Sequence, residues 1–219
     1  MIAAAERLDR IHSDIAVAAR LAGRKPETVQ LIAVSKGRTA EEIESLLAAG
    51  HRDFGENRVQ EVAAKWPDLL AHYPDVRLHA IGRLQSNKAG EALALFHTIH
   101  SLDRRSLLDA LAKEAVRTSR CPGVYLQVNI GEEEQKGGCA IGDIGALAAA
   151  VRSSPLALAG LMAIPPLGAE PAPYFALLAK LARANSIAGL SIGMSGDFKT
   201  AIMLGATAVR IGTAMFDDR

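Results

Sequence analysis

The feature that most constrains the fold is the regular alternation of short apolar runs with longer segments of helical pattern. Apolar, β-branched runs bounded by polar residues or glycine predict buried strands, and apolar residues repeated at the helical period predict helices. The predicted strands are 29–35, 52–55, 77–81, 98–102, 124–130, 156–163, 190–194 and 207–211. The predicted helices between them are 39–49, 59–71, 86–95, 104–117, 144–152, 172–185 and 197–204.

Eight strands, seven intervening helices and one amphipathic helix in front, at residues 1–20, form the pattern of a single α/β (β/α)₈ TIM barrel. A doubly wound sheet normally needs fewer strands. A length of 219 residues fits one such barrel, so we expect residues 1–219 to form a single domain. Segment 131–142 carries a run of glutamates and several glycines, and we expect it to be an exposed, mobile loop.

Composition and charge argue against several functional classes. With 25 basic and 24 acidic residues, the formal net charge of +1 offers no electrostatic footprint for nucleic acid or an anionic membrane. Charges within residues 1–20 argue against a signal peptide, and no later segment is apolar enough to span a bilayer. Cys121 and Cys139 lack metal-ligand spacing, and His97 and His100 would face opposite sides of a strand, so we expect no metal site. We expect a cytoplasmic monomer.

The barrel assignment indicates where functional groups should lie, because active groups in this fold occupy the loops that follow the strands. The loops after the seventh and eighth strands, 193–196 and 210–213, are rich in small residues and include the hydroxyls of Ser195 and Thr213. In this fold, backbone N–H groups of those two loops often bind phosphate. Either loop alone is as well explained by a tight turn, but the two together favour a phosphate site.

Arg210 lies within the last predicted strand. If Val209 and Ile211 pack outward against helices, strand alternation turns Arg210 into the barrel. A buried guanidinium needs a partner. The sequence leaves two open, an internal salt bridge with a residue such as Glu56 or Asp103, or an acceptor on a ligand.

Lys36 stands at the end of the first predicted strand, in a run of apolar residues that stops abruptly at Ser35. Lysines at strand ends are usually solvated. Lysine is, however, the residue that forms a Schiff base with a carbonyl ligand when its charge is disfavoured. Across the barrel mouth from a phosphate site, it favours a ligand with both an aldehyde and a phosphate, which is pyridoxal 5′-phosphate (PLP).

Sequence blocks along nearly the whole chain then carry a family resemblance. They are VSK at 34–36, FGENRVQE at 54–61, HAIGRLQSNK at 79–88, LQVNI at 126–130, GLM at 160–162, SIGMS at 191–195 and VRIGTA at 209–214. In this order they resemble the YggS/PROSC family of PLP homeostasis proteins. That family is similar to the barrel domain of fold-type III PLP enzymes such as alanine racemase.

The resemblance implies a set of cofactor-binding residues. It implies that Lys36 forms the covalent aldimine with PLP and that Arg210 faces the pyridine nitrogen. A cation there keeps this nitrogen unprotonated and weakens the ring as an electron sink. The remaining residues implied to bind the cofactor are Asn57 and Met194, which line the pocket, and Ser195, Gly212 and Thr213, which hold the phosphate.

Two positions depart from the family pattern. Arg83 stands where the family usually has proline, and Ala80 where it usually has an aromatic residue. Both bear on the shape of the loop after the third strand, whereas the cofactor motifs are intact.

We derive the expected function from the second acid/base residue that a racemase needs and that we do not expect here. Alanine racemases that resemble this barrel carry a C-terminal β-domain with a tyrosine that acts opposite the lysine, whereas this sequence ends at Arg219 and Tyr73, Tyr125 and Tyr174 lie away from the strand ends. Racemisation needs proton transfer on both faces of the substrate, so no catalytic residue is assigned. We expect a protein that carries or buffers PLP, supports amino acid homeostasis and supplies PLP-requiring apo-enzymes. A small PLP-dependent racemase and a Schiff-base aldolase acting on a sugar phosphate remain alternatives.

Overall fold

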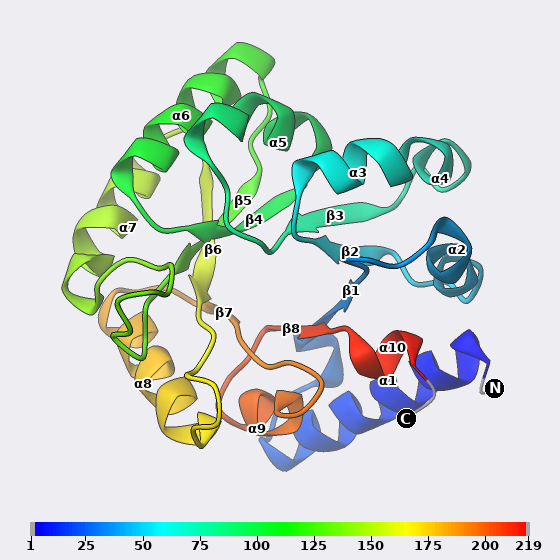
Figure 1. Cartoon of the computed structure of the whole chain (residues 1–219). Coiled ribbons are helices and arrows are strands. Elements are labelled where there is room, and N and C mark those ends of the chain that lie inside the picture. The colour runs from blue at the N-terminus through cyan, green and yellow to red at the C-terminus, as the bar shows by residue number, and fades with distance from the viewer. Residues whose placement is uncertain (1–2, 218–219) are drawn as a thin grey trace.

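A computed structural model describes residues 3–217 of the chain. Eight parallel strands close into a barrel in sequence order, and the last strand pairs with the first. Helices surround the strands on the outside (Figure 1). The predicted TIM barrel is confirmed. The strands are β1 (Gln30–Val34), β2 (Asp53–Glu56), β3 (Arg77–Ala80), β4 (Thr98–Leu102), β5 (Gly123–Gln127), β6 (Ala157–Met162), β7 (Gly189–Ser191) and β8 (Ala208–Ile211).

The helices follow the predicted order with two differences. They are α1 (Ala4–Leu21), α2 (Ala40–Ala48), α3 (Val59–Lys65), α4 (Pro67–His72), α5 (Ala89–Leu95), α6 (Arg105–Thr118), α7 (Ile144–Arg152), α8 (Pro171–Ala184), α9 (Phe198–Met203) and α10 (Thr213–Phe216), with short 3₁₀ turns at Pro26–Thr28, Ser86–Lys88 and Ile141–Asp143. The single helix predicted at 59–71 is wrong. Pro67 has no N–H to donate, so it begins a new helix at its first position. Helix α10 is too short to give a periodic signal.

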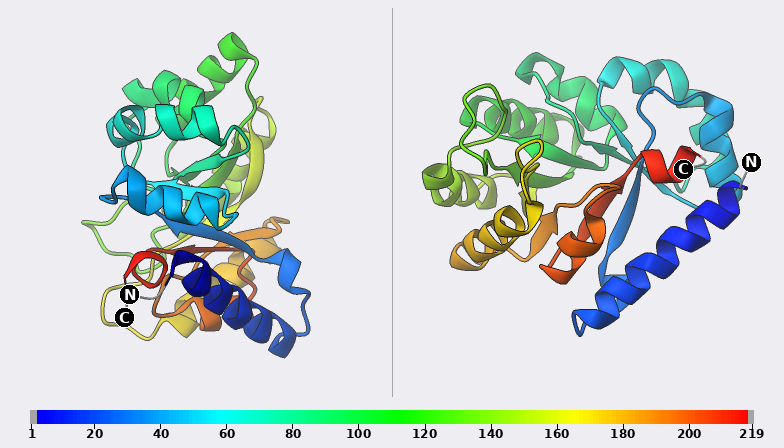
Figure 2. Two further views of the ribbon diagram at one scale, coloured as in Figure 1. Left: turned by 90° about the vertical axis from the view of Figure 1, so that its right-hand side faces the viewer. Right: turned by 60° about the horizontal axis from the view of Figure 1, so that its bottom comes forward.

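Helix α1 closes one side of the barrel. Its apolar face is buried through Leu8, Ile11, Ile15, Ala18 and Ala19. It packs on α9 and α10, and Figure 2 shows it along the outside of the barrel with α10 beside it. Because α10 directly follows β8, this contact supports the loop that carries Thr213.

The segment 131–142 is tied down at several points. Cys139 is buried and forms an isolated bridge with Val128, next to β5. Lys136 Nζ lies 2.6 Å from Glu133 Oε2 and donates to Pro165 O at 3.2 Å, in the loop after β6. The structure thus departs from the expected exposure at Cys139, while the expected mobility stays a prediction.

The barrel interior contains polar and aromatic side chains. The ring of Tyr125 on β5 stacks on the imidazole of His100 on β4, with centroids 4.4 Å apart. Space for Tyr125 depends on Gly160 of β6, because a Cβ there would lie 2.5 Å from Tyr125 Cε1 and 2.3 Å from Gly189 O. The barrel interior is therefore partly polar, with His79, His100, Ser191 and Arg210 among its buried residues.

No helix within residues 3–217 has the length and apolar character needed to cross a bilayer. The same residues contain no cluster of histidine, cysteine and carboxylate side chains arranged to bind a metal ion.

Candidate functional site

Lys36 lies immediately beyond β1, at the carboxyl end of the barrel, and is exposed. Within residues 3–217 its Nζ atom has no hydrogen-bond or ion-pair partner. The preceding Ser35 is fully buried. Its amide donates to Gly55 O at 3.0 Å, its hydroxyl donates to Glu56 Oε1 at 2.7 Å, and its carbonyl accepts from Lys65 Nζ at 2.9 Å. The Lys36 side chain is therefore free, whereas Ser35, directly before it, is held by three hydrogen bonds.

Helix α2 fixes the other side of the Lys36 loop. Thr39 caps the helix, with its hydroxyl accepting from the Glu42 amide at 3.3 Å while the Glu42 carboxylate accepts from the Thr39 amide at 2.8 Å. This reciprocal pair satisfies two backbone donors at the helix start. Arg38 then pairs with Asp217 at 2.7 Å, just beyond α10. The loop after β1 is thus linked to the segment after β8.

The loops after β7 and β8 present unused backbone donors. The amides of Ser195 and Gly196 have no acceptor among residues 3–217, and the amide of Thr213 begins α10 and cannot bond within it. The hydroxyl of Ser195 accepts from the Ala214 amide at 3.5 Å, which joins the two loops. Gly193 turns the first loop at a φ of 94°, where a Cβ would lie 2.7 Å from Ala201.

The two loops also lie close to β1. A Cβ on Gly212 would lie 3.4 Å from Val34 Cβ, two residues before Lys36. The neighbouring Met194 is exposed, and its amide donates to Asp197 Oδ1 at 2.6 Å. The structure therefore brings Lys36, Met194, Ser195, Gly212 and Thr213 to one end of the barrel, as the sequence predicts.

Arg210 is buried inside the barrel, in agreement with strand alternation. Its Nη1 donates to the carbonyl and the hydroxyl of Ser191, both at 2.6 Å, and its Nη2 donates to Ala163 O at 3.3 Å. Burial lowers the pKa of Arg210 to about 10, opposed by Asp197 and Tyr125, so the guanidinium is charged at neutral pH.

Of the two alternatives left open for Arg210, the internal salt bridge is formed with neither suggested partner. Glu56 pairs with Lys65, and Asp103 pairs with Arg104. Within residues 3–217 no carboxylate lies within ion-pair distance of Arg210. Its neutral acceptors leave the positive charge available to a ligand.

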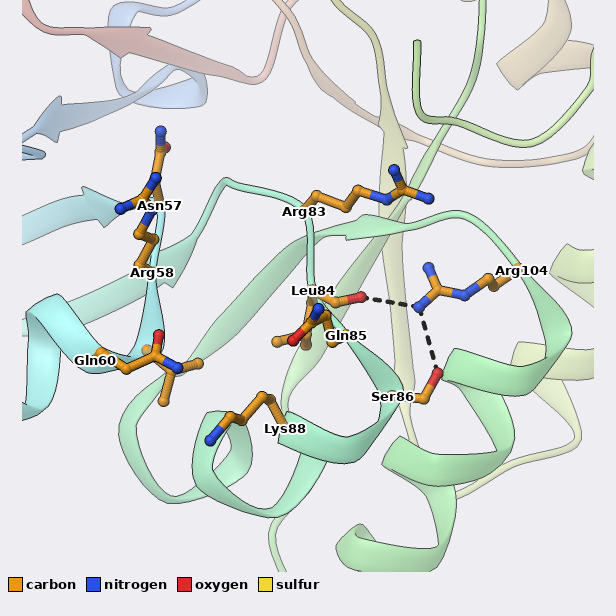
Figure 3. Close-up of a pocket in the computed structure, with 10 residues that line it drawn as sticks. Asn57, Arg58, Gln60, Arg83, Leu84, Gln85, Ser86, Lys88 and Arg104 are labelled. Atoms are coloured by element: carbon orange, nitrogen blue, oxygen red, sulfur yellow. Dashed lines mark hydrogen bonds between the residues drawn. The ribbon is translucent and has the colours of Figure 1, made fainter. Parts of the chain in front are cut away.

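Asn57 follows β2 and lies against the loop after β3, where a Cβ on Gly82 would lie 2.4 Å from Asn57 O. Beside it opens a pocket of about 600 Å³ between the loops after β2, β3 and β4 (Figure 3). Arg104 turns back to Leu84 O and Ser86 Oγ, whereas Arg83 extends along the pocket wall.

The charges around this pocket are largely compensated. Arg58, Lys88 and Arg104 each lie near a carboxylate, on Glu61, Glu91 and Asp103 respectively. Arg83 has no such partner among the described residues. The loop after β3, which carries the departure at Arg83, therefore places one uncompensated cation in the pocket that Asn57 also lines.

The contacts between buried polar side chains inside the barrel were not predicted from the sequence. His79 is a buried residue whose imidazole contacts His100 and Asp53, and neither contact was predicted. His97 is exposed and lies just before β4, whereas His100 is buried within β4. Strand alternation identifies the inward residues but not which of them touch, because the register between strands is not readable from one sequence.

The chain is similar to known proteins over nearly its whole length. The family model described as alanine racemase, N-terminal domain, matches residues 7–219. A Pseudomonas aeruginosa protein named pyridoxal phosphate homeostasis protein is 43% identical over 221 residues, covering 98% of this chain and 95% of that protein. One of the same name from Escherichia coli is 38% identical over 231 residues, covering 98% and 96%. The chain belongs to the family of pyridoxal phosphate homeostasis proteins. The resemblance seen in the sequence is confirmed.

Solved structures place the barrel of this pyridoxal phosphate homeostasis family member in context. PipY of Synechococcus elongatus, solved with PLP bound, has a TM-score of 0.80 and 39% identity, covering 93% of this chain and 100% of that chain. An alanine racemase of Clostridium difficile has a TM-score of 0.71 and 14% identity, covering 96% of this chain and 56% of that chain. The second likeness shows a shared barrel fold alone.

Proposed function

We propose that this chain binds PLP at the carboxyl end of its barrel and serves PLP homeostasis as a carrier or buffer of the cofactor. The observation that carries the proposal is the pairing of an unpartnered Lys36 with unused backbone donors on the β7 and β8 loops, at the same barrel end. PLP is the ligand that matches both, since it joins an aldehyde to a phosphate. The names of the relatives and the PLP-bound PipY structure support the same cofactor.

The residues fit the phosphate group. The amides of Ser195, Gly196 and Thr213, which have no acceptor among residues 3–217, belong to two neighbouring segments joined through the Ser195 hydroxyl. Backbone N–H groups in such a concavity bind anions without any nearby cation. Gly212 allows the backbone to approach, because no side chain projects from it. These residues bind and orient the cofactor.

The residues also fit the ring and the aldehyde. Bound PLP supplies an electrophilic aldehyde and an electron-withdrawing pyridine ring. Lys36 Nζ would add to the aldehyde carbon and release its oxygen as water, which gives a covalent adduct. Arg210 would hold a positive charge next to the ring nitrogen and so disfavour its protonation. Asn57 and Met194 would line the sides of the pocket.

The same geometry favours carriage over catalysis. Tyr125 is buried beneath the barrel mouth, and burial raises its pKa. Tyr73 follows α4, where Arg52 stacks on its ring, and Tyr174 lies in α8. No tyrosine is thus placed to act opposite Lys36, and an unprotonated pyridine nitrogen would further slow carbanion chemistry. We propose little or no catalysis, a monomeric cytoplasmic protein of one domain, and PLP-requiring apo-enzymes as recipients.

The test is a titration of the purified protein with PLP, followed by visible absorbance. The wild-type protein should develop the band of a lysine-linked cofactor, and Lys36→Ala should not. Lys113→Ala, an exposed lysine of α6, is the matched control and should behave as wild type. Retention of the band in Lys36→Ala would contradict the assignment of Lys36 as the lysine that binds PLP.

A second measurement separates carriage from the two catalytic alternatives. Solvent deuterium incorporation into amino acids, at a turnover well above that of free PLP, would favour a racemase. Trapping of a sugar-phosphate carbonyl by borohydride without PLP would favour an aldolase. The proposed function predicts neither.

A further inference from the structure

A line of five buried side chains crosses the barrel interior from Arg210 to Asp53. Arg210 Nη1 lies 2.6 Å from Ser191 Oγ, which lies 2.9 Å from His100 Nδ1. His100 Nε2 lies 3.1 Å from His79 Nδ1, and His79 Nε2 lies 3.1 Å from Asp53 Oδ1. All five residues are buried. Asp53 begins β2, whereas Arg210 lies near the end of β8, so the line joins the two ends of the barrel.

Both ends of the line have a fixed hydrogen-bonding role. A guanidinium only donates, so Ser191 Oγ accepts from Arg210. At the other end, burial works against the charge of Asp53, but hydrogen bonds from His79 and Arg77 lower its pKa to about 2. Asp53 is therefore a carboxylate at neutral pH and only accepts.

If His79 and His100 are both neutral, the fixed roles of Arg210 and Asp53 leave only one arrangement of protons on the two rings. His79 must carry its proton on Nε2 to donate to Asp53, which leaves Nδ1 as an acceptor. His100 must then carry its proton on Nε2 and accept on Nδ1. The hydroxyl of Ser191 donates to that nitrogen. Burial, with His79 and Arg210 nearby, lowers the pKa of His100 well below its usual value, which keeps this ring neutral.

We propose that Asp53 is a positioning residue that acts through His79, His100 and Ser191 to hold the guanidinium of Arg210 against the ring nitrogen of bound PLP. This inference rests on the PLP-binding function proposed above. Asp53 lies at the opposite end of the barrel from Lys36, so it takes no part in the phosphate or aldehyde contacts.

Asp53 affects Arg210 because its charge sets which group donates and which accepts at each hydrogen bond of the line. While the Ser191 hydroxyl donates to His100, its lone pairs are free to accept from Arg210. With the order reversed, Ser191 Oγ would accept from both His100 and Arg210, and its own hydrogen would have no acceptor among the described residues. An unmet buried donor costs free energy, so loss of the Asp53 charge should loosen the guanidinium.

The first experiment needs no cofactor. Nitrogen-15 NMR of the histidine side chains in the apo-protein should show His79 and His100 each protonated on Nε2 and not on Nδ1. His79→Gln and His100→Gln assign the signals. A proton on Nδ1 of either ring, or a doubly protonated ring, would overturn the arrangement.

The second experiment compares Asp53→Asn and Ser191→Ala with Ser101→Ala. Ser101 is a buried serine of β4 whose hydroxyl has no partner among residues 3–217, which makes it a matched control. The Kd for PLP should rise about fivefold in Ser191→Ala and about threefold in Asp53→Asn, the change expected for one lost or weakened hydrogen bond. The pyridine nitrogen-15 shift of labelled PLP should move in both variants and stay unchanged in Ser101→Ala.

The outcomes separate the two proposals. A wild-type protein that binds no PLP contradicts the proposed function, whereas PLP binding with an unmoved pyridine shift in Asp53→Asn and Ser191→Ala contradicts the positioning role alone. Thermal unfolding of each variant shows whether it is folded. If Asp53→Asn fails to fold, Ser191→Ala decides the question.

Discussion

The Nζ atom of Lys65 lies 2.6 Å from Oε1 of Glu56, and this ion pair supports the backbone that carries Lys36. Glu56 is completely buried at the end of β2. The same Oε1 atom accepts from the Ser35 hydroxyl at 2.7 Å and from the Trp66 indole at 3.0 Å. One carboxylate therefore joins α3 to the ends of β1 and β2.

Lys65→Met should destabilise the protein by about 3 kcal/mol, because it leaves the Glu56 carboxylate buried without its cation. Lys88→Met is the control, since Lys88 pairs with Glu91 at 2.7 Å near the surface, and it should cost less than about 1 kcal/mol. Urea unfolding measures both. Equal, small losses would show that the buried pair adds nothing.

Gly160→Ala should destabilise the barrel by about 2 kcal/mol or more, because the new methyl group would meet Gly189 O and the ring of Tyr125. Gly142→Ala is the control, as a Cβ there meets nothing within 4 Å. Thermal unfolding should separate the two variants clearly. A Gly160→Ala protein as stable as Gly142→Ala would mean that Tyr125 can move aside.

His51 should make stability depend on pH in the acid range. Burial lowers its pKa to about 4, below its ordinary value of 6.5, so the unfolded chain binds the proton first. Stability from this group is complete above pH 6.5 and falls by up to about 3 kcal/mol as the pH drops toward 4. His51→Gln should lose that dependence, whereas His72→Gln, on an exposed helix end, should keep it. Parallel curves for wild type and His51→Gln would contradict the assignment.

Most of the fold could be predicted from the sequence because buried strands and helices carry apolar residues at a regular spacing. The strand predicted at 98–102 matches β4, and Lys36 lies beyond β1 as expected. Helix 59–71 failed because the apolar period continues through Pro67, while proline's missing donor breaks the helix.

Contacts inside the barrel could not be predicted in the same way. His79 pairs in register with Thr98, which places His100 one pleat further along the same face. That register sets the line from Asp53 to Arg210, and it depends on the stagger of the closed barrel. The partner of Glu56 was missed for a similar reason, since Lys65 reaches it from an outer helix.

The most direct test of the account is to map the borohydride-reduced PLP adduct by peptide mass spectrometry. The protein is mixed with PLP, reduced and digested, and the lysine that carries the cofactor is identified. We predict that Lys36 is the single modified residue and that the Lys36→Ala variant is unmodified. Modification spread over several exposed lysines, or retained in Lys36→Ala, would contradict it.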